Sequence, residues 1–334
     1  MLFTRTPVRD APRPEAEPPL GARDILDGGA PVDVLARSPF VLAWLRLRRD
    51  RTAMAALAVL AAIVVFALLA PLWASLTGHP YDATFPGTGL DAYGQPVGPG
   101  REFWLGADQL GRDVLVRAAY GARVSLLVGV GSAALAALAG VAAGLVAGFA
   151  GGVLDALLAR LMDITLALPY LLVAITLATT FQLSSTGAGL AMTMLVIAFF
   201  SFAALGRVVR AEVLSLKRQG FVEAARALGA GPARIMYGEI LPNLAGPVIV
   251  LTALMIPTAI VFEATLSFLG VGVRAPVPSW GGMLGEGGEA FRSAWWLLAV
   301  PGALLLATTL SFNLLGDGVR DALGPDGGTS VRKG

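Results

Sequence analysis

Residues 223–243 read EAARALGAGPARIMYGEILPN, and this polar segment lies between two long, nearly uncharged apolar runs. The residues that begin it have good helix propensity. Gly229, soon followed by Pro232, should end that helix and turn the chain, and Pro242 is tolerated in the first turn of a following helix. The pattern predicts two short helices in an L shape, the second formed by ARIMYGEI, between two longer apolar helices.

The composition indicates that most of the chain lies in lipid. Of the 334 residues, 56% are hydrophobic and only 14% are charged, with a mean hydropathy of +0.72. Soluble domains have about 25% charged residues, so the apolar excess predicts membrane-spanning segments. A net charge of +2 gives no sign of a nucleic-acid partner. The lack of cysteine and the single histidine, His79, argue against a metal site or cofactor in this chain, and His79 is expected in a loop.

Six apolar runs are long enough to cross a bilayer, which needs about 20 residues. They are residues 53–76, 122–149, 161–183, 189–210, 243–271 and 294–315. The predicted fold is therefore an all-α membrane protein with about six transmembrane helices. The predicted segments are a disordered tail (1–37), an interfacial helix (38–52), the first span (53–76), an external loop (77–120), a five-span core (121–316) that includes the loop 217–242, and a second tail (317–334).

Lysine and arginine are enriched at one end of these spans. If the N-terminus is inside, the inner ends receive Arg46, Arg48, Arg49, Arg51, Arg160, Arg210, Lys217, Arg218, Arg226, Arg234 and Arg320. The outer ends receive Arg101, Arg112, Arg117, Arg123, Arg274 and Arg292. This bias predicts that both tails and the 217–242 loop are cytoplasmic and that the 77–120 loop is external.

Two local patterns predict where helices begin and bend. Asp108 is the expected N-cap of a surface helix ahead of the second span, because Leu110, Val114 and Ala118 recur at helical spacing. Pro169 lies within the third apolar run and is expected to kink it.

Two sets of intramembrane residues are candidates for a functional role. Gly140, Gly144 and Gly148 recur every four residues on one helix face, which allows another helix to approach closely. That face either packs the bundle or forms a moving interface. Glu263 lies within the fifth run, where a carboxylate costs roughly 2.5–3.5 kcal/mol. It either lines a translocation path or gate, or it is a hydrogen-bonded strut near the outer end.

The polar segment resembles the EAA motif of permease subunits of ABC importers. The residues that match are Glu223-Ala224-Ala225, then Gly229 after three residues, then Leu241-Pro242. Four other stretches, LGADQLGRDVLVRAAYGARVSLLVG, LSFLGVGV, PSWGGML and FNLLGDGVRDAL, are similar to the C-type permease of dipeptide, oligopeptide and nickel importers. The resemblance covers nearly all of the chain beyond residue 38.

The resemblance implies a bundle like that of type I ABC importers, with a coupling helix that docks on a cytosolic ATPase. The residues that it implicates are Glu223, Ala224, Ala225, Arg226, Leu228, Gly229, Leu241 and Pro242. It further implies a homologous second permease, two cytoplasmic ATPase subunits and an extracytoplasmic substrate-binding protein, at a bacterial inner membrane. No G-x-x-x-x-G-K-[ST] loop occurs in these 334 residues, so ATP and Mg²⁺ are expected on the ATPase subunits and no enzymatic activity is expected here.

Alternatives in substrate and in mechanism remain open. The resemblance predicts ATP-driven import of di- or oligopeptides, with nickel or another small solute as the alternative cargo. A proton-coupled secondary transporter, with Glu263 as its proton carrier, is the alternative from another class, and it would need no ATPase partner.

Overall fold

The computed structural model describes residues 39–181 and 185–324. The predicted tail 1–37, residues 182–183 of the third apolar run and the last ten residues lie outside the described part. The chain divides into two units, residues 1–42 and 43–334, and only residues 39–42 of the first are described. Every helix after α2 belongs to the second unit.

The described residues form helices, with only two isolated β-bridges in addition. The elements are α2 (Pro39–Leu47), α3 (Arg51–Leu68), α4 (Ala70–Thr77), α5 (Pro86–Gly89), α6 (Val114–Ala150), α7 (Gly152–Ala167), α8 (Tyr170–Thr180), α9 (Thr186–Leu216), α10 (Gly220–Ala227), α11 (Pro232–Arg234), the π-helix η2 (Ile235–Ile240), α12 (Leu241–Phe268), α13 (Trp280–Gly287) and α14 (Trp296–Leu323). The predicted all-α class is confirmed.

Five helical segments are long and apolar enough to cross a membrane: α3, α6, α9, α14 and the continuous stretch from α11 through α12. A sixth is formed if α7 and α8, which bend by 87° relative to each other, count as one broken span. The break falls at Leu168, because the residue before a proline disfavours the helical conformation and Pro169 lacks the N–H needed to continue the helix. The prediction of about six transmembrane helices is confirmed, and Pro169 breaks the third run more sharply than a kink.

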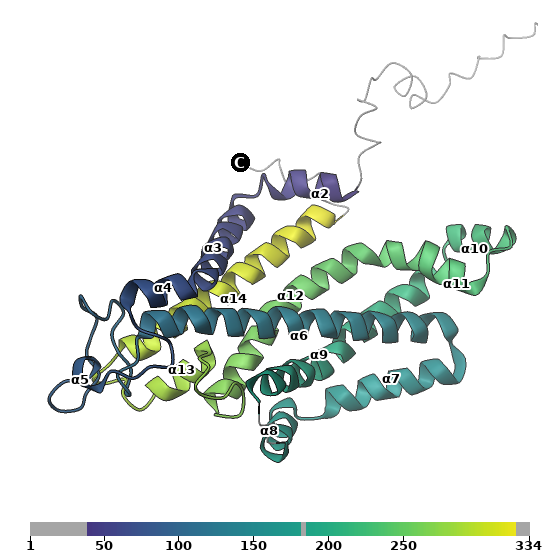
Figure 1. The fold of residues 1–334 in the computed structure, drawn as a ribbon. Helices are drawn as coiled ribbons and strands as arrows, with labels where there is room; N and C mark the ends of the chain where they lie inside the picture. The colour runs from purple at the N-terminus through teal and green to yellow at the C-terminus, as the bar shows by residue number, and fades with distance from the viewer. Residues whose placement is uncertain (1–38, 182–184, 325–334) are drawn as a thin grey trace, which may run out of the picture. The chain divides into compact units, whose positions relative to one another are not determined.

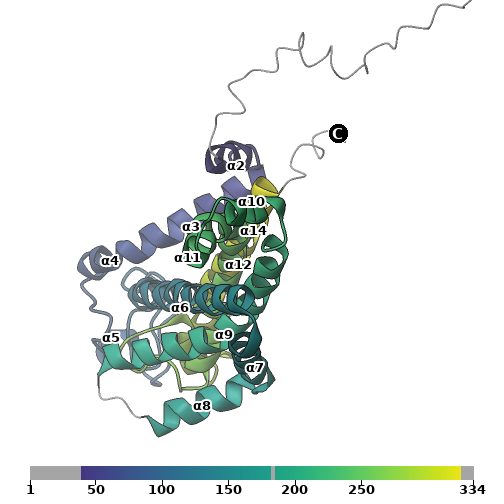
Figure 2. The same ribbon diagram turned by 90° about the vertical axis from the view of Figure 1, so that its right-hand side faces the viewer.

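Helix α6 is central to the second unit. It packs against α9, α12 and α3, while α14 packs against α12 and α3. The loop that contains α5 lies at one end of α6, as does α13, whereas α10 and α11 lie at the other end (Figure 1). In the view turned by 90°, α9 again lies beside α6 (Figure 2). The polar segment 223–243 is thus separated from the 77–113 loop by the length of the bundle.

The start of α6 differs from the prediction. Asp113, not Asp108, is the N-cap, and its Oδ1 accepts hydrogen bonds from the amides of Leu115 at 2.8 Å and Val116 at 3.2 Å. Asp108 instead closes a turn, which Gly111 completes with a φ of +73°. A left-handed residue interrupts a helix. There is therefore no separate surface helix, and α6 runs unbroken for 37 residues from Val114.

The glycine face of α6 packs directly on α9. Gly140, Gly144 and Gly148 are all buried. A Cβ atom on Gly144 would lie 2.5 Å from the carbonyl oxygen of Gly206, and one on Gly140 would lie 2.8 Å from that of Phe202. Only glycine permits this backbone approach, so the face is part of the bundle packing. That it also moves stays a prediction.

Helix α14 extends further than predicted at its C-terminal end. It continues to Leu323, so residues 317–323, which were expected in a tail, are helical. Gly318 lies so close to Ala53 of α3 that a Cβ on it would be 2.6 Å from the Ala53 Cβ. This packing explains why the helix persists past the apolar run.

Candidate coupling surface and buried polar clusters

Helix α10 carries the first half of the polar segment and ends where the sequence predicts. Gly229 has a φ of +83°, a left-handed conformation that glycine enters far more easily than other residues. The Gly229 amide donates a hydrogen bond to the carbonyl oxygen of Arg226 at 2.9 Å. No atom lies near the position that a Cβ on Gly229 would take, so the backbone conformation, and not space, requires glycine.

One side of α10 faces solvent and the other faces the protein. Its exposed residues include Glu223, Ala224, Arg226, Ala227 and Leu228, and these five are here called the coupling surface. Leu228, the first residue after the helix, is 88% exposed. Ala225, which the resemblance groups with the docking residues, instead packs against this chain's own core. Of the two alanines in the Glu223-Ala224-Ala225 motif, Ala224 is therefore the one that can meet a partner.

The second short helix of the predicted L is not separate. α11 passes into the π-helix η2, which passes directly into α12. Pro242 has no N–H to donate to the carbonyl oxygen of Gly238, and the turn widens so that the Leu241 amide donates to Met236 five residues back. Pro242 lies in the first turn of α12, as predicted, and is exposed, whereas Leu241 is partly buried. Residues 232–268 thus form one continuous helical stretch.

An apolar cluster fixes α10 to the ends of the long helices. Val222 is fully buried, in a cluster that includes Val213 of α9, Leu145 of α6 and Leu244 of α12. Lys217 Nζ also donates to the carbonyl oxygen of Phe149 at 2.6 Å, at the C-terminal end of α6. α10 contacts η2, and its buried residues share one packed cluster with residues of α6, α9 and α12, so a force on the coupling surface would pass through this cluster to all three long helices.

Glu263 lies at the other end of the bundle and is completely buried, with 0% exposure. Its carboxylate accepts hydrogen bonds from Ser125 on α6 and Ser267 on α12. From the sequence, Glu263 could either line a translocation path or gate or act as a hydrogen-bonded strut. This geometry is that of a strut within one chain, although a function in transport stays a prediction.

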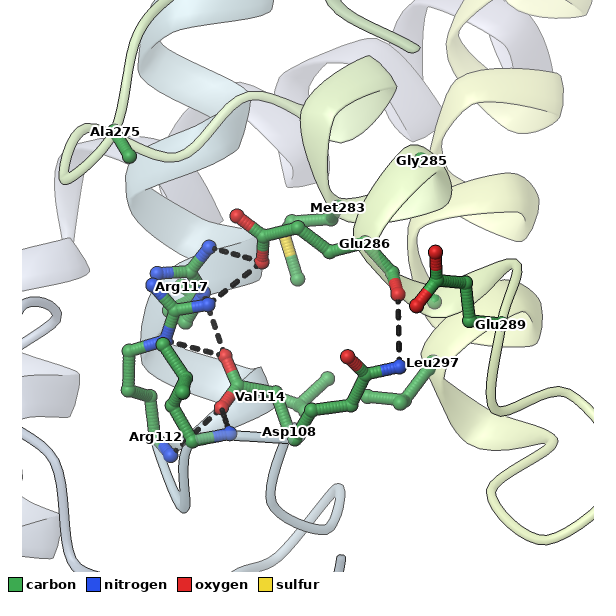
Figure 3. Close-up of a pocket in the computed structure, with 13 residues that line it drawn as sticks. Asp108, Arg112, Val114, Arg117, Ala275, Met283, Gly285, Glu286, Glu289 and Leu297 are labelled. Atoms are coloured by element: carbon green, nitrogen blue, oxygen red, sulfur yellow. Dashed lines mark hydrogen bonds and ion pairs between the residues drawn. The ribbon is translucent and has the colours of Figure 1, made fainter. Parts of the chain in front are cut away.

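A cluster of four charges, which no sequence pattern predicts, ties the 77–113 loop to α13 (Figure 3). Arg112 donates to Asp108 at 2.6 Å and to Glu286 at 2.7 Å. Arg117 pairs with Glu286 at 2.8 Å and with Asp108 at 3.3 Å. The four residues border a cavity of about 350 Å³. Two arginines and two carboxylates balance one another, so the cluster stabilises this end of the fold without a net charge.

His79 lies in the loop before α5, as expected, but it is buried at 6% exposure. Its Nδ1 lies 2.9 Å from Oδ2 of Asp113, and its ring stacks on Phe103 with centroids 4.6 Å apart. His79 thus helps to hold the residue that caps α6, and these contacts explain its burial.

The chain has the architecture of a polytopic membrane protein, with long apolar helices at its centre. A charged cluster closes one end of the bundle, and an exposed helix protrudes at the other end. Residues 140–326 match the family described as binding-protein-dependent transport system inner membrane component. Residues 38–92 match the N-terminal transmembrane domain of oligopeptide transport permease C. The chain belongs to this family of inner-membrane permease subunits of ABC importers.

Several curated proteins are similar over most of their length. The dipeptide transport system permease protein DppC of Alkalihalophilus pseudofirmus is 38% identical over 290 residues, which cover 87% of this chain and 91% of that protein. The oligopeptide transport system permease protein OppC of Escherichia coli is 38% identical over 294 residues, 88% of this chain and 93% of its own. The glutathione transport system permease protein GsiD of Escherichia coli is 38% identical over 289 residues, which cover 86% of this chain and 91% of that protein.

Proposed function

We propose that this chain is one of two permease subunits of an ATP-driven importer of di- and oligopeptides. The observation that carries the proposal is the coupling surface, an exposed helix held on three long helices by one apolar cluster. A surface of this kind can pass a displacement from a cytosolic subunit into the membrane spans. The names of the relatives DppC and OppC support peptides as cargo.

The remaining subunits follow from this proposal. A homologous permease provides the other half of the path, two ATPase subunits bind ATP and Mg²⁺ on the cytoplasmic side, and a substrate-binding protein delivers peptide on the external side. Lipid surrounds the spans, where exposed leucines such as Leu138, at 71%, and Leu306, at 67%, face outward. The chain itself catalyses no reaction in this scheme.

The lysine and arginine bias supports an orientation with the coupling surface and both tails in the cytoplasm and the predicted 77–120 loop outside. Closure of the ATPases on ATP would then press on α10. The cluster beneath α10 would transmit that movement to α6, α9 and α12, which changes the side of the membrane to which the path opens.

Reconstitution of the complete complex into liposomes tests this function. We expect uptake of a radiolabelled tripeptide that requires ATP and the binding protein and that continues after the proton gradient is collapsed. Excess unlabelled dipeptide should compete, and excess Ni²⁺ should not. Uptake driven by a proton gradient without ATP would favour the secondary transporter instead, and competition by Ni²⁺ alone would change the cargo to nickel.

A further inference from the structure

Glu263 joins two helices through serine hydroxyl groups. Ser125 Oγ on α6 donates to one carboxylate oxygen at 2.8 Å, and Ser267 Oγ on α12 donates to the other at 2.7 Å. All three residues are buried, with exposures of 0%, 0% and 5% for Glu263, Ser125 and Ser267. Both carboxylate oxygens therefore have partners within this chain.

Each serine also accepts a hydrogen bond from the segment that follows α12. The Val273 amide donates to Ser267 Oγ at 3.0 Å, and the Trp280 amide donates to Ser125 Oγ at 3.3 Å. A hydroxyl group has one proton, so a serine that accepts from an amide can use that proton to reach Glu263. Glu263 thus sets the direction of two chains of hydrogen bonds.

The two series of hydrogen bonds reach the two ends of the linker between α12 and α13. Val273 lies near the start of the linker, and Trp280 is the first residue of α13. The Trp280 ring is fully buried, and its Nε1 donates to the carbonyl oxygen of Ala118 on α6 at 3.1 Å. A Cβ on Gly281 would collide with the backbone of Ala264. The linker and α13 are therefore held tightly against α6 and α12.

The other end of α13 is held by the charge cluster. Glu286 accepts from Arg112 at 2.7 Å and from Arg117 at 2.8 Å, and both arginines lie at or next to the start of α6. The Glu286 backbone oxygen also accepts from Gln109 at 3.1 Å. With its first and seventh residues both bonded to the α6 region, α13 is a rigid element at this end of the bundle.

We propose that Glu263 is a positioning residue for the segment 269–287, and that it fixes the position in which the exposed linker residues 274–276 meet the external substrate-binding protein. The inference rests on the proposed function, which puts α13 on the external side. This positioning role requires a side chain with two acceptor oxygens, one for each serine, and a carboxylate provides both.

Glu263→Gln tests the proposal in the complete reconstituted complex. The glutamine amide keeps one acceptor oxygen but presents N–H groups to the second serine, whose proton then has no acceptor. We expect normal membrane abundance and normal basal ATP hydrolysis. The concentration of peptide-loaded binding protein that half-maximally stimulates hydrolysis should rise roughly 10-fold, the effect of one buried hydroxyl group left without an acceptor.

Two serine variants and one control make the test specific. Ser267→Ala and Ser125→Ala each remove one chain of hydrogen bonds, so both should raise the half-maximal concentration in the same direction. Thr265→Val is the matched control, because the Thr265 hydroxyl donates only to the carbonyl oxygen of Val261 in its own helix, at 2.8 Å. It should respond to the binding protein as the unmodified complex does.

The outcomes separate this inference from the proposed function. An unmodified complex that the binding protein does not stimulate would refute both. A stimulated complex in which Glu263→Gln and Ser267→Ala keep the original half-maximal concentration would overturn the positioning role alone. If Glu263→Gln does not accumulate in the membrane, the Ser267→Ala variant tests the proposal instead. An unchanged half-maximal concentration of binding protein in Ser267→Ala would likewise overturn the proposal.

Discussion

The main-chain amide of Ala230 donates a 3.0 Å hydrogen bond to the carbonyl oxygen of Ala225, five residues earlier. With the bond from Gly229 to Arg226, it forms a Schellman cap, which places a left-handed residue at Gly229. Ala225 and Ala230 also pack against the same apolar cluster. The angle at which the chain leaves α10, and with it the presentation of the coupling surface, therefore depends on Gly229.

Single cysteines can test the predicted orientation, since the chain has no native cysteine. Ala227 is exposed at the α10 end and Tyr93 is 90% exposed in the opposite loop. In intact cells, a membrane-impermeant thiol reagent should label Tyr93→Cys and leave Ala227→Cys unlabelled. Ala227→Cys should react once the membrane is permeabilised. Labelling at Ala227 but not at Tyr93 in intact cells would reverse the topology.

Gly144→Ala should weaken the contact between α6 and α9. Its new Cβ would lie 2.5 Å from the Gly206 carbonyl oxygen and 2.8 Å from the Val209 Cβ, so the helices must separate. Overpacking of this kind costs about 1–3 kcal/mol. We expect a lower thermal unfolding midpoint of the purified complex in detergent and reduced membrane abundance.

Gly246→Ala is the control for that substitution. Gly246 lies inside α12, and nothing is within 4 Å of the position of its added Cβ. Alanine has the higher helix propensity, so the unfolding midpoint should stay the same or rise. Equal destabilisation by the two substitutions would show that close packing at Gly144 is unimportant.

Asp108→Asn should loosen the charge cluster more than Glu286→Gln does. The Asp108 side chain is 7% exposed and that of Glu286 is 40% exposed. Water can therefore replace Glu286 as a hydrogen-bond partner of the arginines more readily than it can replace Asp108. Loss of one partner leaves the buried Arg112 and Arg117 undercompensated, and we expect about 1–3 kcal/mol of lost local stability at Asp108.

Hydrogen exchange of residues 107–117 can measure this local stability. Exchange there should accelerate in Asp108→Asn, less so in Glu286→Gln, and not in Glu289→Gln, since Glu289 makes no ion pair among the described residues. Unchanged exchange in Asp108→Asn would mean that the four charges do not hold the loop to α13.

The sequence predicted those features of the fold that depend on local pattern. Apolar runs located the long helices, and the order of Gly229 and Pro232 located the end of α10. The choice between Asp108 and Asp113 as N-cap could not be made locally, because both aspartates precede suitable residues. Tertiary contacts decide it: Gly111 adopts a positive φ, and Asp113 bonds to His79 from 34 residues away.

Long-range partners explain most of what the sequence could not show about the candidate sites. Arg117 and Glu286 are 169 residues apart in the chain, and Ser125 and Glu263 are 138 apart, so no spacing links them. A carboxylate in an apolar run did mark Glu263 as a candidate, but its partners emerge only when α6 and α12 pack. The inward orientation of Ala225 likewise depends on the cluster beneath α10.

Gly229→Val, compared with Gly231→Val, tests most directly whether the α10 surface couples this permease to its ATPases. Gly229 needs a φ of +83°, whereas Gly231, at φ −71° and ψ 162°, has a conformation open to valine. The strain at Gly229 is roughly 1–2 kcal/mol, small against the packed spans but enough to redirect a docking helix.

The measurement is co-purification of the ATPase subunits with the permease, with membrane abundance and tripeptide uptake recorded in the same cells. We expect that Gly229→Val accumulates normally but loses most of the bound ATPase and the uptake, while Gly231→Val retains both. Normal ATPase binding and normal uptake in Gly229→Val would contradict the assignment of α10 as the coupling helix.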